Sequence, residues 1–132
     1  MGTRADFYIK KNQQLEWLGS IAWDGMPDSI DKKVLKAKTE DEYLSSLKQF
    51  LSKRKDTTYP KYGWPWPWED SNITDYAYIY DNGKVMASNF GSILFNPLKQ
   101  EPNNPKGIKI DFPNMEKIQN VNWGERSGLI II

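Results

Sequence analysis

Apolar and polar residues alternate along the first part of this chain. One face of residues 3–9 carries Ala5, Phe7 and Ile9, and the other carries Arg4, Asp6 and Tyr8. This alternation predicts a β-strand. Residues 10–14 are polar and residues 15–23 are largely apolar again, so we expect an N-terminal hairpin. Residues 31–38 predict one or two helical turns.

A helical period replaces the alternation after residue 39. Thr39, with Glu42 three residues later, has the pattern of a capping box. The apolar residues that follow at helical spacing are Tyr43, Leu44, Leu47, Phe50 and Leu51. We predict a helix over residues 40–54. Its basic end, Lys53-Arg54-Lys55, is expected to be solvated and to complement the helix dipole, with an anion-binding patch as the alternative.

Residues 75–89 predict a second hairpin. Asn82-Gly83 is the strongest short turn signal, because both residues tolerate positive φ angles. The expected cross-strand pairs are Asp81 with Lys84 (as an ion pair), Tyr80 with Val85, Tyr78 with Ala87 and Tyr76 with Asn89.

The remaining segments complete one domain over residues 1–132. Residues 56–74 form a long loop, and further strands are expected at residues 107–112 and 129–132. We therefore predict an α+β fold. It has a mainly antiparallel sheet of about four to six strands, with the helix of residues 40–54 packed on one face.

Residues 63–71, here called the Trp-Pro segment, read Gly-Trp-Pro-Trp-Pro-Trp-Glu-Asp-Ser. Proline fixes its own φ and favours extended geometry in the residue before it, so we expect a stiff, polyproline-like rod. Rings on such a rod point in different directions. We expect Trp66 to be the buried anchor, and Trp64 or Trp68 to be the ring that is partly exposed.

Composition restricts the chemistry. The 132 residues carry a net charge of +1, so there is no global attraction to nucleic acid or membrane, and we do not expect a nucleic-acid polymer as partner. Cysteine and histidine are absent, which excludes disulfides, Ser-His-Asp and Cys-His arrangements and histidine zinc sites. No apolar leader or long apolar run is present, and we expect a cytoplasmic protein without a cofactor.

Four groups of residues could still carry chemistry. The acids Asp24, Asp28, Glu69, Asp70 and Asp75 could hold a divalent cation or act as an acid pair, although turn capping is favoured over both. The aromatic group comprises Tyr8, Trp17, Trp23, Trp64, Trp66, Trp68, Tyr76, Tyr78 and Tyr80. Some of these rings should be core, but strand alternation should send others outward to stack on a ligand.

The third group is cationic. Arg4 lies near Lys10 and Lys11 and on the same strand face as Asp6. A salt bridge between Arg4 and Asp6 is favoured over anion recognition by Arg4. The fourth group, the lysines at positions 32, 33, 36 and 38, is expected to form a solvated face.

Several motifs together resemble a family of small bacterial and phage proteins to which no activity is attached. They are Gly2-Thr3-Arg4-Ala5-Asp6-Phe7-Tyr8, Glu16-Trp17-Leu18-Gly19-Ser20, Trp23-Asp24-Gly25, the Trp-Pro segment and Thr74-Asp75-Tyr76-Ala77-Tyr78. The resemblance covers about residues 1–97 and transfers no functional residue. It implies an accessory or counter-defence role.

These observations favour a non-enzymatic binding protein that captures a small, nucleotide-like ligand. The expected ligand contacts are Arg4, Tyr8, Trp64, Trp66, Trp68, Glu69, Asp70, Tyr76 and Tyr78. A protein–protein interaction module that presents the Trp-Pro segment is the first alternative. A carboxylate-based enzyme, with or without a divalent metal, is the second. No catalytic or metal-binding residue is assigned.

Overall fold

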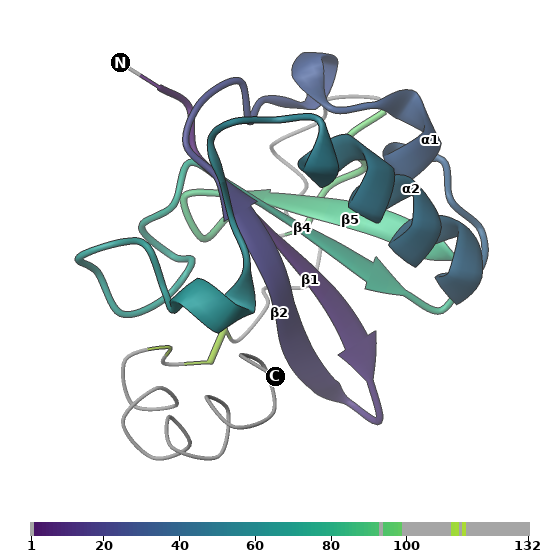
Figure 1. The fold of residues 1–132 in the computed structure, drawn as a ribbon. Coiled ribbons are helices and arrows are strands. Elements are labelled where there is room, and N and C mark those ends of the chain that lie inside the picture. Colours follow the sequence, from purple (N-terminus) through teal and green to yellow (C-terminus); the bar gives the residue numbers. More distant parts are fainter. Residues whose placement is uncertain (1, 93, 99–111, 114, 116–132) are drawn as a thin grey trace.

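The structure is a computed structural model and describes residues 2–92, 94–98, 112, 113 and 115. Within these residues, one sheet has the strand order β3-β2-β1-β4-β5 (Figure 1). The strands are β1 (Ala5–Lys11), β2 (Gln14–Ile21), β3 (Thr57–Thr58), β4 (Tyr76–Asp81) and β5 (Lys84–Asn89). β1 runs parallel to β4, and the other neighbours are antiparallel. This confirms the predicted α+β fold with a mostly antiparallel sheet.

The N-terminal hairpin is confirmed, and two residues form its turn. Asn12 and Gln13 both have positive φ angles, of 51° and 63°, which is the geometry of a two-residue hairpin turn. The pairing shifts between Phe7 opposite Gly19 and Tyr8 opposite Trp17. Leu18 is therefore the extra residue of a β-bulge, and such a bulge bends and twists the strand that contains it.

The second hairpin has the expected register. Asp81 pairs with Lys84 and Tyr76 with Asn89, around a turn in which Gly83 has a φ of 90°. The expected ion pair beside the turn is wrong, because Asp81 instead forms an ion pair with Lys10 of β1, at 3.9 Å.

Helices cover one face of the sheet (Figure 1). The main helix, α2 (Glu40–Ser52), begins with the predicted capping box between Thr39 and Glu42. A one-turn helix, α1 (Lys32–Leu35), packs beside it. Two short 3-10 turns, η1 (Pro27–Ser29) and η2 (Pro60–Tyr62), lie in the connections.

The sequence predicts a solvated basic end of the helix, but in the structure Arg54 is bound to other residues of the chain. The side chain of Arg54 forms an ion pair with Asp56 at 2.8 Å and donates a hydrogen bond to the Trp23 carbonyl at 2.7 Å. Asp56 in turn accepts hydrogen bonds from the backbone N–H groups of Ala22 and Trp23. The end of α2 is thereby tied to the end of β2.

Both faces of β1 and β4 are buried, so the expectation that alternation would send half of their rings outward is wrong. Ala5, Phe7, Ile9 and Tyr78 belong to the core under the helices. Tyr8, Ala77 and Ile79 belong to a second core on the opposite face, together with Trp17, Phe112 and Met115. The Trp-Pro segment covers this second core through Trp64.

β3 was not predicted, because only two residues form it within the long loop that the sequence indicated. The strand expected at residues 129–132 lies outside the described residues, as does the one expected at 107–112 apart from Phe112. Within the described part of the chain, no helix is long and apolar enough to cross a membrane.

The Gly83→Val substitution tests the second hairpin. A β-branched residue is strained at the positive φ of Gly83, and we expect the free energy of unfolding to fall by more than about 1 kcal/mol. The measurement is thermal or denaturant unfolding. Lys84→Val, which places the same side chain on the adjacent exposed strand position, should cost less. Equal stability of Gly83→Val and the parent protein would contradict the turn geometry.

Candidate functional site

A fully buried carboxyl group lies at the centre of the second face of the sheet. Asp6 accepts hydrogen bonds from the Ser20 hydroxyl at 2.5 Å, the Ser71 hydroxyl at 2.6 Å and the Trp66 indole N–H at 2.7 Å. Its side chain is completely inaccessible to solvent. In the described part of the chain, no lysine or arginine forms an ion pair with it.

Aromatic donors reach this carboxyl group through hydroxyl groups. The Trp17 indole N–H donates to Ser20 at 3.0 Å, and the Tyr8 hydroxyl lies 2.7 Å from the Ser71 hydroxyl. Because the Ser71 proton is directed at Asp6, Tyr8 is the donor to Ser71. Asp6 is therefore the common acceptor of a network that includes β1, β2 and the Trp-Pro segment.

Burial shapes the ionisation of this network. Burial raises the pKa of Asp6, while hydrogen bonds from Ser20, Ser71, Thr74 and Trp66 lower it, and burial is the larger effect. Burial, together with the nearby charge of Asp6, also raises the pKa of Tyr8 well above its ordinary value. The Tyr8 hydroxyl therefore keeps its proton and acts as a donor.

The Trp-Pro segment is not the extended rod that its sequence predicts. It bends over residues 66–70, and the Trp64 indole N–H donates to the carbonyl of Trp68, four residues later, at 2.6 Å. The rings of Trp66 and Trp68 stack 5.6 Å apart instead of diverging. Hydrogen bonding of each indole within the protein overrides the local preference of the prolines.

Each tryptophan of the segment is partly buried. The expectation of one buried ring is therefore wrong, while the expectation of a partly exposed ring holds. Trp66 does anchor the segment, but through its hydrogen bond to Asp6. The Trp68 indole donates to the Thr74 hydroxyl at 3.0 Å.

Arg4 lies over the stacked tryptophans instead of pairing with Asp6. Its guanidinium carbon is 5.6 Å from the Trp66 ring centroid and 5.3 Å from that of Trp68, which is cation–π geometry. Its ion-pair partner is Asp75, at 3.9 Å. The favoured Arg4–Asp6 salt bridge is therefore wrong.

The residues expected to contact a ligand do not line one cavity. Tyr76 and Tyr78 stack on each other in the core under the helices, whereas Tyr8 and Trp64 lie on the opposite face of the sheet. Tyr78 is fully buried and donates to the Gly25 carbonyl at 2.6 Å. Two acids, Glu69 and Asp70, were also expected to contact the ligand. The Asp70 carboxylate accepts a hydrogen bond from the Asn72 backbone N–H at 2.9 Å, and Glu69 is exposed.

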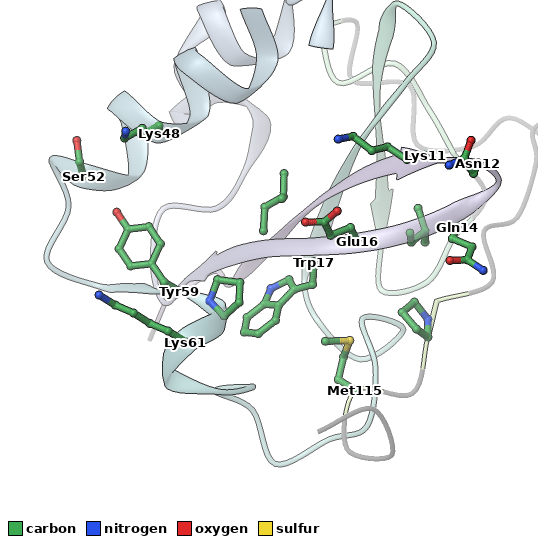
Figure 2. Close-up of a pocket in the computed structure, with 14 residues that line it drawn as sticks. Lys11, Asn12, Gln14, Glu16, Trp17, Lys48, Ser52, Tyr59, Lys61 and Met115 are labelled. Carbon is green, nitrogen blue, oxygen red and sulfur yellow. The ribbon is translucent and has the colours of Figure 1, made fainter. Parts of the chain in front are cut away.

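A groove among the described residues lies elsewhere, along β2. It has a volume of about 980 Å³, and Figure 2 shows its lining. The contributing elements are the β1–β2 turn, β2, the C-terminal half of α2 and η2, with Pro113 and Met115. β3 pairs only with Ser20 and Ile21, so the groove runs beside the part of β2 that β3 does not cover.

One end of this groove combines an aromatic ring with positive charge. Tyr59, Lys48 and Lys61 line that end, and Tyr59 lies between the two lysines in Figure 2. Trp17, almost fully buried, and Leu18 contribute apolar surface. Lys11, at the other end, is neutralised by Glu40 at 3.0 Å, so Lys48 and Lys61 supply the positive charge available to a ligand.

The sequence did not predict the groove, because β2, α2 and the long loop build it and lie far apart in the sequence. Tyr59 and Lys61 belong to the long loop, and Lys48 belongs to an exposed position of α2. Each is an ordinary surface residue in the sequence. The available signal was the aromatic and basic sequence Tyr59-Pro60-Lys61, which lies two residues before the start of the Trp-Pro segment.

The acids do not form a metal centre: among the described residues, no group of three or more carboxylates could hold a metal ion. Comparison with known proteins gives no further guidance, because no family model, curated protein or solved structure matches this chain. The resemblance drawn from its motifs stays a prediction.

The Asp6→Asn substitution tests the buried network. Asparagine offers one acceptor oxygen and points an NH₂ group at donors, so we expect the free energy of unfolding at pH 7 to fall by about 2–4 kcal/mol. Asp81→Asn, at an exposed acid, is the matched control and should change it by less than about 1 kcal/mol.

The pH dependence provides a second test. Because the pKa of Asp6 is raised on folding, the folded protein binds this proton more tightly than the unfolded chain does. The contribution of Asp6 to stability therefore grows as pH falls through its folded pKa, and is complete below the unfolded value of about 3.9. The stability gap between the parent protein and Asp6→Asn should widen on acidification. A gap that narrows would contradict the raised pKa.

Proposed function

We propose that the protein is a non-enzymatic binding protein and that the groove along β2 captures a nucleotide-like ligand. The observation that carries this proposal is the end of the groove where Tyr59 lies with Lys48 and Lys61. A flat ring can stack on a tyrosine face, which contributes about 1–3 kcal/mol. The two ammonium groups suit the phosphates of the same molecule.

The size and lining of the groove agree with such a ligand. A volume of about 980 Å³ is at the upper end of the range for small-molecule sites. Leu15 and Leu18 offer apolar surface beside the polar contacts. The ligand class is the one that the sequence favoured, but the supporting residues differ from the expected set.

The absence of an acid pair in the groove supports binding without chemistry. Glu16 is the one carboxylate among the described lining residues, and the chain has no histidine or cysteine. General acid–base catalysis needs positioned groups with matched pKa values, and a single exposed carboxylate is a poor candidate for this role. Capture of a nucleotide-like signal would suit the accessory or counter-defence role that the motif resemblance implies.

Isothermal titration with adenosine triphosphate, adenosine and inorganic triphosphate tests the proposal. We expect the triphosphate nucleotide to bind with a dissociation constant of about 1–100 μM, and the two fragments at least tenfold more weakly. Lys48→Gln and Lys61→Gln should each weaken binding about three- to tenfold, and Tyr59→Leu about tenfold. The nucleotide should be recovered intact after incubation with or without Mg²⁺.

Lys36→Gln is the matched control, because Lys36 is exposed and does not line the groove. It should bind as the parent protein does. The proposal fails if none of these compounds binds, or if the Lys48, Lys61 and Tyr59 variants bind as tightly as the Lys36 variant.

A further inference from the structure

Phe90, directly after β5, combines an exposed side chain with a strained backbone. Its φ angle is +49° and its side chain is 58% exposed. A bulky residue is rarely found in this left-handed region, which glycine and asparagine adopt more easily. Burial does not offset the strain here, because the ring stays largely in solvent. Phe90 therefore lowers the stability of the isolated chain, which suggests a role outside it.

A second exposed apolar residue lies beside Phe90. The loop after β5 packs directly on the turn before β4: a Cβ atom at Gly91 would lie 2.5 Å from the Asn72 side-chain oxygen. The N–H of Phe90 also donates to the carbonyl of Asp75 at 3.1 Å. Ile73, next to Asn72, is 54% exposed. Phe90 and Ile73 are thus two exposed apolar residues on adjacent backbone segments where β4 begins and β5 ends, and this region is here called the sheet-end surface.

Charges of both signs border this surface. Arg4 is bound to Asp75 by a backbone hydrogen bond of 2.7 Å and an ion pair of 3.9 Å, and its side chain is still 43% exposed. Asp70 belongs to the same turn as Ile73, whose N–H lies 3.5 Å from the Asp70 carbonyl. Asp75 also lies here, but its side chain is only 18% exposed, so Arg4 and Asp70 are the charges that remain open to a partner. An apolar centre with such a pair of charges beside it can be complementary to a copy of itself after a two-fold rotation.

We propose that the sheet-end surface docks a second copy of the chain about a two-fold axis. Phe90 and Ile73 of the two copies form the apolar centre, and Arg4 of each copy faces Asp70 of the other. The described residues that line the groove along β2 do not include any of these four. The dimer is therefore independent of the proposed nucleotide site, and either can fail without the other.

Sedimentation velocity on the full chain over a range of concentrations tests the proposal. We expect a reversible monomer–dimer equilibrium with a dissociation constant on the order of 10–100 μM. Phe90→Asn and Ile73→Ser should each weaken it at least tenfold, and Arg4→Gln should weaken it several-fold. Tyr62→Asn, which removes an aromatic ring that is 68% exposed elsewhere, is the control and should leave the equilibrium unchanged.

The strained backbone of Phe90 gives a second readout, which a general loss of structure would not give. At concentrations where both proteins are monomeric, Phe90→Asn should melt about 2–5 °C above the parent protein, because asparagine tolerates the positive φ. A parent protein that stays monomeric up to millimolar concentration would overturn the proposal. A dimer that Phe90→Asn and Ile73→Ser leave unchanged would also overturn it.

Discussion

The carboxyl group of Asp6 connects parts of the chain that are far apart in sequence. It lies on the central strand and accepts hydrogen bonds from Ser20, which is 14 residues away, and from Trp66 and Ser71, which are 60 and 65 residues away. A carboxyl group inaccessible to solvent is costly unless donors satisfy it. Once Asp6 is buried, the Trp-Pro segment must therefore lie over this face of the sheet in a conformation that supplies those donors.

The same constraint explains why the segment departs from the geometry that its prolines favour. A straight polyproline helix would direct its rings to different sides. Bending over residues 66–70 lets Trp66 reach Asp6, and lets Trp64 and Trp68 satisfy their indole groups locally. All three indole N–H groups donate hydrogen bonds inside the protein. The main role of the segment is therefore structural, because it covers the second core of the sheet. Arg4 and the stacked rings of Trp66 and Trp68 remain only partly open to solvent.

Local signals predicted the parts of the fold that depend on neighbouring residues. The capping box at Thr39 and the Asn82-Gly83 turn act within a few residues, so the start of α2 and the register of the second hairpin were predicted correctly. The parallel pairing of β1 with β4 joins strands about 70 residues apart, and no local pattern encodes it. This pairing places β1 and β4 inside the sheet and buries both faces, so Tyr76 and Tyr78 could not form a site with Tyr8.

Local sequence signals also could not predict the residues of the proposed site. Lys48, Tyr59 and Lys61 come together because α2 and η2 flank the uncovered part of β2, and only the folded chain shows this. The groove is built on elements that Asp6 and Arg54 hold in place, through Ser20 near the end of β2 and through Asp56 after α2. A site on a braced strand requires little ordering when a ligand binds, which favours affinity.

Hydrogen exchange of the tryptophan indole protons, followed by NMR, tests the central role of Asp6 most directly. If the Trp66 N–H is held by the buried carboxyl group, it should exchange at least about 100-fold more slowly than that of Trp23, whose side chain is 48% exposed. Its opening free energy should approach that of global unfolding. Exchange of Trp66 as fast as Trp23, while the backbone amides of β1 stay protected, would show that Asp6 does not hold the Trp-Pro segment on the sheet.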